Sequence, residues 1–448
     1  LNDSATAHVV IVDCIFDGDR DNHDDVLDWA AGYGVALSTA TIQRCRFINM
    51  PNECMTIGSG SIIDCTSEDC WGSFFHASNA VQANSRGILI QNCYTKNTNT
   101  KNNGHDEGVI TFSAQSQNIR VRDCVFDNSA GTKGQGVFGL LDSDSSADYD
   151  QNFFAENVVA ENFGTILTMS SSQSVAPVVF DRIHLSKCTF TTCGSLTITG
   201  KDVRKVGYVN EVTISDCTFI NCWAYFADIR TLNLINNNWS WDVGGGGVCC
   251  GIAASNLFAN LPTTRPDGAA RVTGDYAGLL LVDGANPQGV YVWDGSAWVY
   301  SSAETAKFPP PISVYANILV EDCGLNLVGG SLRAPGYPGI RGDMSTGLLL
   351  SNVRRQKLES GADSDVFYAQ VSIDNFDLDG FPYGITNHAS AATWVAAAYA
   401  ADVAGWSYSN IRVKGMRSTT WTTIIGIEVP AGCVAEDCKV YLPSTSVS

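Results

Sequence analysis

The chain has 448 residues, of which 45% are hydrophobic and 16% are charged, so it is long enough to bury a large core. Its formal net charge of −19 makes nucleic acid and anionic membrane surfaces poor partners, because both are negatively charged. An acidic polysaccharide would also be repelled unless a cation or a local cluster of Lys and Arg intervened. No run of about 18 apolar residues occurs, so we expect no membrane insertion. The chain begins at Leu1 rather than Met, and we expect that an upstream region was removed or that this is a fragment.

A short motif recurs along most of the chain: an apolar residue, two polar residues, Cys, any residue and usually another apolar one. The Cys position, here called the Cys slot, is filled by cysteine at 14, 45, 65, 93, 124, 188, 217, 323 and 438. Degenerate copies place other residues in the slot: Asn157, Asn237, Val353, Phe376 and Ile411. Within each block, spacings run from 20 residues (217 to 237) to 35 residues (376 to 411). Such spacing is typical of a repeat protein in which each unit stacks on the next.

The motif predicts two strands joined by a bend. Ile214 and Cys217 are both expected to face inward, although residues three apart on a straight strand face opposite sides. A bend at Ser215–Asp216 removes this conflict. Most copies hold Asn or Asp at the bend, and these residues tolerate a left-handed backbone: Asp13, Asp64, Asn92, Asp123, Asp216, Asn236, Asp322, Asn352, Asn375, Asn410 and Asp437.

This inward ladder with its Asn-rich corner resembles the right-handed parallel β-helix of pectin-lyase-like proteins. The resemblance implies an all-β solenoid, a right-handed single-stranded parallel β-helix, with a small antiparallel β insert. We expect a first block of coils at 1–254, the insert at 255–310, and a second block with a C-terminal tail at 311–448. A glycine followed by an apolar run predicts a third strand in several coils: Gly72–His76, Gly108–Ser113, Gly136–Leu141, Gly164–Met169 and Gly194–Thr199. In the resembling family this strand and the loop before it frame the sugar-binding groove.

The chain has 16 cysteines, and those in the slot repeat with the coils. Cys70, Cys193 and Cys222 each follow a slot cysteine by five residues and form a second column. We interpret both columns as small buried residues in ladders. Disulfides between the columns and zinc binding stay open as alternatives, although no pair with zinc-ligand spacing occurs.

Residues 255–310 interrupt the repeat. Three short strands are predicted there: Gly278–Val282, Gly289–Trp293 and Ala297–Tyr300. Asp294-Gly295 predicts a hairpin turn between the last two. The stretch GVYVWDGSAWV resembles small β inserts of phage tail fibres and tailspikes. Trp293 and Trp298 are candidates for stacking on sugars, and the alternative is that they belong to the insert's own small core. Farther on, Ala391–Ala404 has the periodicity of a short helix.

Residues 17–28 (DGDRDNHDDVLD) have the spacing of a calcium-binding loop. The candidate ligands occupy its alternating oxygen-donor positions and its last position: Asp17, Asp19, Asp21, Asp25 and Asp28. The loop departs from the usual pattern, because Asn22 stands where glycine is standard and Asp28 replaces a bidentate Glu. Calcium is the one metal expected, and no cofactor is required. The alternative is a solvated acidic loop.

A second polar cluster lies before a predicted third strand and is the candidate catalytic site. Its residues are Glu107, Asp142, Asp106 and His105. Neighbouring coils are about 4.8 Å apart, so carboxylates one or two coils apart match the separations, roughly 5 to 9.5 Å, that glycosidases use. A pair such as Glu107 and Asp142 would protonate a glycosidic oxygen and activate water. The alternative is a polar loop rim.

Further candidates for substrate binding beside this cluster are Asp69, His76 and Asp144. Aligning the third-strand glycines places His76 level with inward residues of other coils: Phe112, Leu140 and Ile198. A satisfied core histidine is therefore the alternative for His76.

The resemblance to tailspikes implies a phage receptor-binding protein, located in the virion or otherwise extracellular, that binds and hydrolyses a bacterial surface polysaccharide. Such proteins are usually homotrimers. A polysaccharide lyase or epimerase of the same fold is the first alternative. It would need a base such as Lys, Arg, Tyr or His beside a neutralised uronate carboxylate. A non-catalytic carbohydrate-binding adhesin or structural virion protein is the second.

Overall fold

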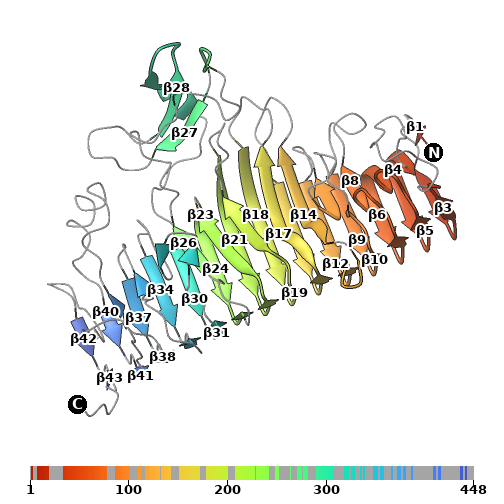
Figure 1. Cartoon of the computed structure of the whole chain (residues 1–448). Helices are drawn as coiled ribbons and strands as arrows, with labels where there is room; N and C mark the ends of the chain where they lie inside the picture. Colours follow the sequence, from red (N-terminus) through yellow and green to blue (C-terminus); the bar gives the residue numbers. More distant parts are fainter. Residues whose placement is uncertain are drawn as a thin grey trace. The chain divides into compact units, whose positions relative to one another are not determined.

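The computed structural model confirms an all-β fold in which parallel strands stack coil upon coil (Figure 1). The structure describes residues 2–3, 8–19, 34–77, 86–100, 108–112, 117–131, 133–142, 151–171, 178–199, 207–227, 229–241, 248–251, 263, 270–274, 276–280 and 289–305, and strand segments between 317 and 440. The chain divides into two compact units, Leu1–Ile198 and Thr199–Ser448. No helix in the described part is both long and apolar enough to cross a membrane.

The parallel strands of the first unit form three rows, here called the pre-bend, post-bend and third sheets; the pre-bend and third sheets are continuous through the long strands β4 and β6. The pre-bend sheet contains β2 (Val9–Val12), β4 (Val35–Gln43), β6 (Met55–Ile63), β9 (Arg86–Gln91), β12 (Gln117–Arg122), β15 (Gln151–Glu156) and β18 (Val178–Ser186). The post-bend sheet contains β3 (Ile15–Asp17), β5 (Arg46–Ile48), β7 (Thr66–Glu68), β10 (Tyr94–Lys96), β13 (Val125–Asp127), β16 (Val159–Glu161) and β19 (Thr189–Thr191). The third sheet contains β1 (Asn2–Asp3), β8 (Phe75–Ala77), β11 (Ile110–Phe112), β14 (Gly134–Asp142), β17 (Phe163–Ser171) and β20 (Ser195–Thr199), joined by the first halves of β4 and β6.

The core lies between the sheets and is built from columns of apolar side chains. In the pre-bend sheet, Ile42 pairs with Ile62, and Ile62 pairs with Ile90. In the post-bend sheet, Phe47 is fully buried and stacks on Phe16 with ring centroids 4.8 Å apart. Because equivalent residues recur once per coil, each side chain packs on its own counterpart in the next coil.

The bend before the Cys slot has the left-handed backbone that the sequence predicts. Six of the predicted Asn and Asp residues have φ between 51° and 58°: Asp13, Asp64, Asn92, Asp123, Asp216 and Asn236. Arg44 and Lys187 take the same conformation, which no sequence rule for bends indicates. The assignment of Asn157 to the Cys slot is wrong. Asn157 has φ 53° and is the bend residue, and the fully buried Val158 fills the slot.

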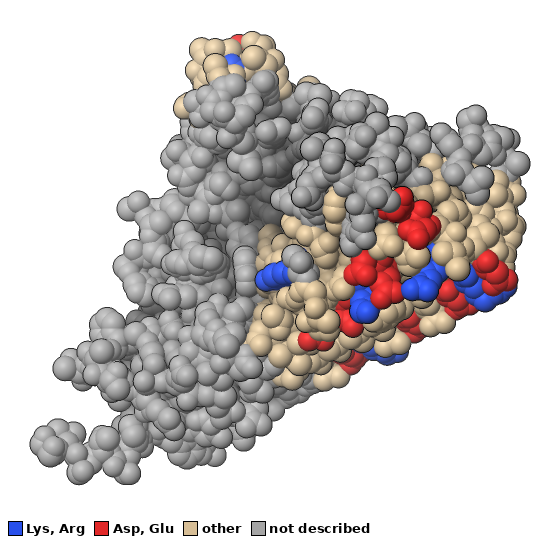
Figure 2. Space-filling view, turned by 45° about the vertical axis from the view of Figure 1, so that its right-hand side comes forward, with Lys and Arg blue, Asp and Glu red and all other residues tan. Residues whose placement is uncertain are grey.

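Side chains at the bend bond to one another between coils. The Asn92 amide donates to Asp64 at 2.6 Å, and the Arg44 guanidinium donates to both oxygens of Asp13 at 2.7 and 2.9 Å. The Arg44 contact lowers the pKa of Asp13. Figure 2 shows acidic and basic side chains lying side by side on the described surface. These contacts offset part of the excess negative charge locally.

The slot cysteines form the buried ladder that the sequence predicts. The described cysteines are free thiols, and all are buried except the half-buried Cys14. The thiol of Cys65 donates to the carbonyl of Ile63 at 3.3 Å and to that of Ile42, one coil away, at 3.6 Å. Cys70, Cys193 and Cys222 of the second column are also buried. No disulfide joins the described cysteines.

The second unit continues the same pattern. Its pre-bend strands are β21 (Gly207–Ser215), β24 (Ile229–Ile235), β30 (Asn317–Glu321), β34 (Gly347–Ser351), β37 (Val371–Asp374), β40 (Ser407–Ser409) and β42 (Val434–Glu436). Its post-bend strands are β22 (Thr218–Ile220), β25 (Asn238–Trp241), β31 (Gly324–Leu327), β35 (Arg354–Lys357), β38 (Asp377–Asp379), β41 (Arg412–Lys414) and β43 (Lys439–Val440). Additional short strands are β23 (Trp223–Ala227), β26 (Val248–Gly251), β32 (Arg333–Ala334), β33 (Tyr337–Pro338), β36 (Asp365–Val366) and β39 (Ile385–Thr386).

Asn237 shows how a polar residue fits the Cys slot in the second unit. Its side chain is 1% exposed. The amide oxygen accepts from the backbone N–H of Cys217 at 2.9 Å, and the amide nitrogen donates to the carbonyl of Ile214 at 2.7 Å. Both polar atoms are thereby satisfied, which is the condition for burying an amide.

The insert within the second unit is the small antiparallel sheet that the sequence predicts. It contains β27 (Tyr276–Leu280), β28 (Gly289–Trp293) and β29 (Trp298–Tyr300), followed by the short helix α1 (Ser302–Thr305). Asp294 and Gly295 form the predicted turn, with Gly295 at φ 109°. The helix predicted at 391–404 lies outside the described residues.

Candidate functional site

The outward side of the third sheet carries a row of polar residues in the first unit. Met55, Phe75, Ile110 and Phe138 form a buried column, and the residue after each faces the other side of the sheet. This outward row runs from Thr56 through His76 and Thr111 to Gly139. Thr56 and Thr111 are fully buried and His76 is 9% exposed, so the row is shielded from water although it faces away from the core.

Glu53 and His76 form a buried acid–imidazole pair, in which His76 belongs to this row and Glu53 lies beside it. Glu53 lies just before β6, and its Oε1 is 3.1 Å from His76 Nδ1. The two side chains are 2% and 11% exposed. The other carboxylate oxygen, Oε2, has no hydrogen-bond partner among the described residues. An unsatisfied buried carboxylate oxygen is costly, so a fold that retains one is expected to use it.

Ser73, Thr111 and Gly108 form a hydrogen-bonded network next to this pair. Ser73 Oγ donates to the Gly108 carbonyl at 2.7 Å, and Thr111 Oγ1 accepts from the Gly108 N–H at 3.2 Å. A Cβ on Gly108 would come within 2.6 Å of the Gly139 backbone nitrogen, so only glycine fits there. The network fixes the point where the chain enters β11, directly after the predicted catalytic residues.

The strand register places Glu53 two coils from that entry point. Met55 pairs with Phe75 and Phe75 pairs with Ile110, so Glu53, Ser73 and Gly108 are level with one another. Two coil spacings amount to about 10 Å. That distance is close to the upper limit, roughly 9.5 Å, for the carboxylate pair of an inverting glycosidase.

Most of the predicted catalytic residues lie outside the described residues. His105, Asp106 and Glu107, like Asp144, lie outside the described residues. Asp142 is the last residue of β14, and only its backbone is described. Gly108 is level with Gly136, and Asp142 is six residues farther along the strand, about 20 Å at 3.3 Å per residue. Glu107 and Asp142 are therefore better tested singly than as a pair.

Two predicted substrate-binding residues occupy different places. His76 belongs to the outward row, and its expected alignment with Phe112 is wrong by one residue, because His76 pairs with Thr111. Gly72 causes the error: it packs against Asn52 at the corner and is not the counterpart of Gly108. Asp69 is a corner residue after β7 with φ 55°, and its Oδ1 accepts from the Asn97 amide at 3.0 Å.

The predicted calcium loop is described only at its start. Asp17 and Asp19 are exposed, and Asp17 Oδ1 accepts from the Asp19 backbone N–H at 3.0 Å and from the Asn49 amide at 3.4 Å. Asp21, Asp25 and Asp28 lie outside the described residues. Within the described part of the chain, no cluster of His, Cys, Asp and Glu is suited to a metal ion. The calcium site stays a prediction.

The two tryptophans of the insert lie mostly inside it. Trp293 and Trp298 are 9% and 8% exposed, with ring centroids 5.2 Å apart in an edge-to-face arrangement. The Arg271 guanidinium lies 4.5 Å from the Trp298 ring centroid. Neither indole N–H group has an acceptor among the described residues. This packing agrees with the alternative that Trp293 and Trp298 belong to the insert's own small core. Stacking on a sugar would require the two rings to become more accessible.

Glu53 is the site residue that sequence reasoning missed. Its signal was available: a carboxylate stands directly before the apolar start of β6, one coil before His76. The arrangement can accept a hydrogen bond at Glu53 Oε2 and orient the imidazole ring through Nδ1. None of the family models, curated proteins or solved structures compared with this chain matches it.

Proposed function

We propose that this chain is a tailspike-like receptor-binding protein that binds a bacterial surface polysaccharide along the third sheet and hydrolyses it. The buried Glu53–His76 pair carries this proposal. It combines an unsatisfied carboxylate oxygen with an oriented imidazole, on an outward row next to the loop that contains Glu107. A buried carboxylate with an unused oxygen is a candidate ligand-binding group, because leaving that oxygen unbonded is costly.

In the proposed reaction, Glu53 and a loop carboxylate act on opposite sides of one glycosidic bond. Protonated Glu53 donates its proton to the leaving oxygen, and the bond from that oxygen to the anomeric carbon breaks. The loop carboxylate, Glu107 or Asp106, takes a proton from water, whose oxygen bonds to the same carbon. His76 holds the Glu53 carboxyl through Nδ1 and does not contact the sugar. Separation across two coils favours inversion of configuration.

The remaining parts of the proposal follow the resemblance to tailspikes. The protein would act as a homotrimer in the virion or outside the cell, with the insert and the acidic loop at 17–28 as accessory elements. Calcium, if bound at that loop, would neutralise acidic side chains there. No step of hydrolysis passes through it.

The test is incubation of the protein with a panel of purified bacterial capsular polysaccharides and O-antigens, followed by assay for new reducing ends. Hydrolysis yields reducing ends without an ultraviolet signal, whereas a lyase also creates an unsaturated uronate that absorbs in the ultraviolet. The variants Glu107→Gln, Asp106→Asn and Asp142→Asn, tested singly, identify the second carboxylate. Binding without any product would leave the non-catalytic adhesin as the function.

A further inference from the structure

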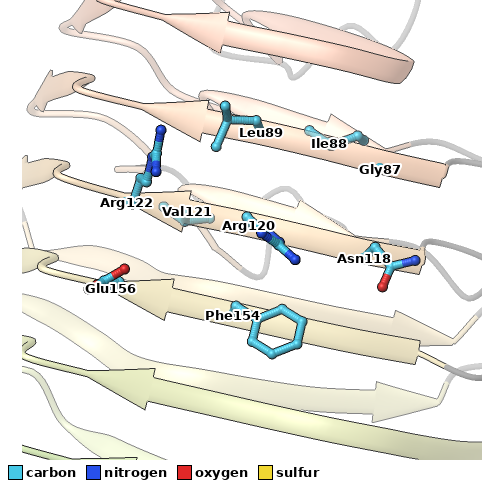
Figure 3. A pocket seen from close by; sticks show the side chains of 9 residues that line it. All are labelled: Gly87, Ile88, Leu89, Asn118, Arg120, Val121, Arg122, Phe154 and Glu156. Atoms are coloured by element: carbon cyan, nitrogen blue, oxygen red, sulfur yellow. The ribbon is translucent and has the colours of Figure 1, made fainter.

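A hollow of about 650 Å³ lies on the outward face of the pre-bend sheet in the first unit (Figure 3). Strands β9, β12 and β15 form its floor, and the side chains that matter for recognition are Leu89, Asn118, Arg120, Arg122, Phe154 and Glu156. Its volume falls within the usual range for small-ligand sites, roughly 300 to 1,000 Å³. The Glu53–His76 pair belongs to other strands, just before β6 and within β8.

Arg120 stands at the centre of this hollow without a carboxylate partner among the described residues. It is exposed, and its guanidinium carbon lies 5.5 Å from the centroid of the Phe154 ring. In Figure 3 its side chain extends from β12 toward Phe154 on β15. The ring holds the guanidinium in place by a cation–π contact and uses none of its N–H donors.

Arg122 adds a second cation on the same strand. Its Nη2 donates to the amide oxygen of Gln91 at 2.8 Å, a neutral partner, and Figure 3 shows it pointing toward β9. Glu156 is level with Arg122 in the sheet, yet it forms an ion pair with Lys187 at 3.4 Å. Two arginines without a described acid are unusual in a chain with 27 basic and 46 acidic residues.

The rows of the sheet give this cluster the geometry of a sugar-chain site. Leu89, Arg120, Phe154 and His184 are level with one another on successive strands. Phe154 is half-buried and meets the His184 ring edge-on at 6.2 Å between centroids. In this row the cation Arg120 therefore lies between an aliphatic and an aromatic side chain, at steps of about 4.8 Å. The C–H face of a sugar ring packs on such surface while a guanidinium fork binds a carboxylate.

We propose that this hollow binds a carboxylate-bearing sugar, such as a uronate, within an acidic polysaccharide strand, with Arg120 as the principal contact. The site is separate from the proposed hydrolytic row and does not depend on cleavage. It supplies the local Arg cluster that an acidic glycan needs in order to approach a chain of net charge −19. A second copy of the chain docked here by a two-fold axis would place Arg clusters opposite each other, which is unfavourable.

The experiment is calorimetric titration of the full chain with a hexamer of galacturonic acid, with maltohexaose as the neutral control. We expect the uronate hexamer to bind, more weakly as sodium chloride is raised, and maltohexaose to bind at least tenfold more weakly. Arg120→Met should weaken uronate binding at least tenfold, and Arg120→Lys should fall between it and the wild type, because Lys keeps the charge but loses the fork. Melting curves verify that each variant is folded.

Lys133→Met is the matched control, since Lys133 is also an exposed cation but lies outside the hollow. It should bind like the wild type. Three results would overturn the inference: no binding of the uronate hexamer, unchanged binding by Arg120→Met, or equal loss in Lys133→Met. A change in oligomer mass caused by Arg120→Met would identify the hollow as a contact between copies instead.

Discussion

The row of slot cysteines and the outward row of the third sheet are formed by the same stacked coils, yet they treat polar atoms in opposite ways. In the slot row each thiol or amide finds carbonyl partners, as Cys65 and Asn237 do. Beside the outward row, Glu53 keeps one buried oxygen without a partner among the described residues. The slot row therefore contributes stability, whereas Glu53 retains hydrogen-bonding capacity that a ligand can use.

The largest expected effect comes from breaking the ladder itself. Phe47→Ala removes a fully buried ring that stacks on Phe16 and leaves a cavity between coils. The free energy of unfolding, measured with urea, should fall by about 3 to 5 kcal/mol. Val10→Ala is the control, because Val10 is 62% exposed, and it should change stability by no more than about 0.5 kcal/mol. Equal effects of the two variants would contradict the ladder.

The next effect concerns the amide in the slot. Asn237→Ala leaves the Cys217 N–H and the Ile214 carbonyl without the side-chain partners they now have. Stability should fall by about 1 to 3 kcal/mol in urea unfolding. Asn238→Ala, at an exposed neighbouring position, serves as the control and should be nearly neutral. A neutral Asn237→Ala would mean that the slot does not require satisfied polar atoms.

A pH prediction follows from the slot thiols. Burial raises the pKa of Cys65 to about 12 from an ordinary value of 9.0. Above pH 9 the unfolded thiol ionises while the folded one stays protonated, so stability is lost as the pH rises through this window. Between about pH 8 and pH 10 the wild type should lose about 1.4 kcal/mol more than Cys65→Ala. Parallel pH profiles of the two proteins in urea unfolding would refute the prediction.

The smallest expected change in stability comes from replacing the buried Glu53–His76 pair. The double variant Glu53→Leu/His76→Phe replaces the buried pair with apolar groups and removes the unsatisfied oxygen. Its unfolding free energy should lie within about 1 kcal/mol of the wild type or above it. Glu53→Leu alone removes the Glu53 contact of His76 Nδ1 and should be less stable than the double variant. A loss of about 3 kcal/mol in the double variant would show that the pair is structural.

The sequence predicted the fold well because the repeat constrains it at every coil. Asp64 and Asp123 marked bends correctly, since the left-handed backbone favours a few residue types. Arg44 and Lys187 were not predicted as bend residues, because their side chains do not favour the left-handed backbone conformation. The slot at Val158 was misplaced by one residue, because a valine there carries no mark that separates it from its neighbours.

The candidate site was harder to predict for two physical reasons. A one-residue difference in register decides which side of a sheet a residue faces, and the glycines at 72 and 108 are not equivalent. That error is the source of the core-histidine alternative for His76, and Glu53 was not among the predicted site residues. The acidic loops vary in length between coils, so the repeat places no constraint on residues such as Glu107.

Reducing-end release by wild type and Glu53→Gln, on a bacterial polysaccharide from the panel, tests the central claim most directly. The amide keeps the shape of Glu53 and can still accept from His76 but cannot donate an acidic proton. The account predicts product from the wild type and a loss of at least about 100-fold in rate for Glu53→Gln, with melting curves unchanged. Equal rates for the two proteins, or no product from any polysaccharide, would contradict it.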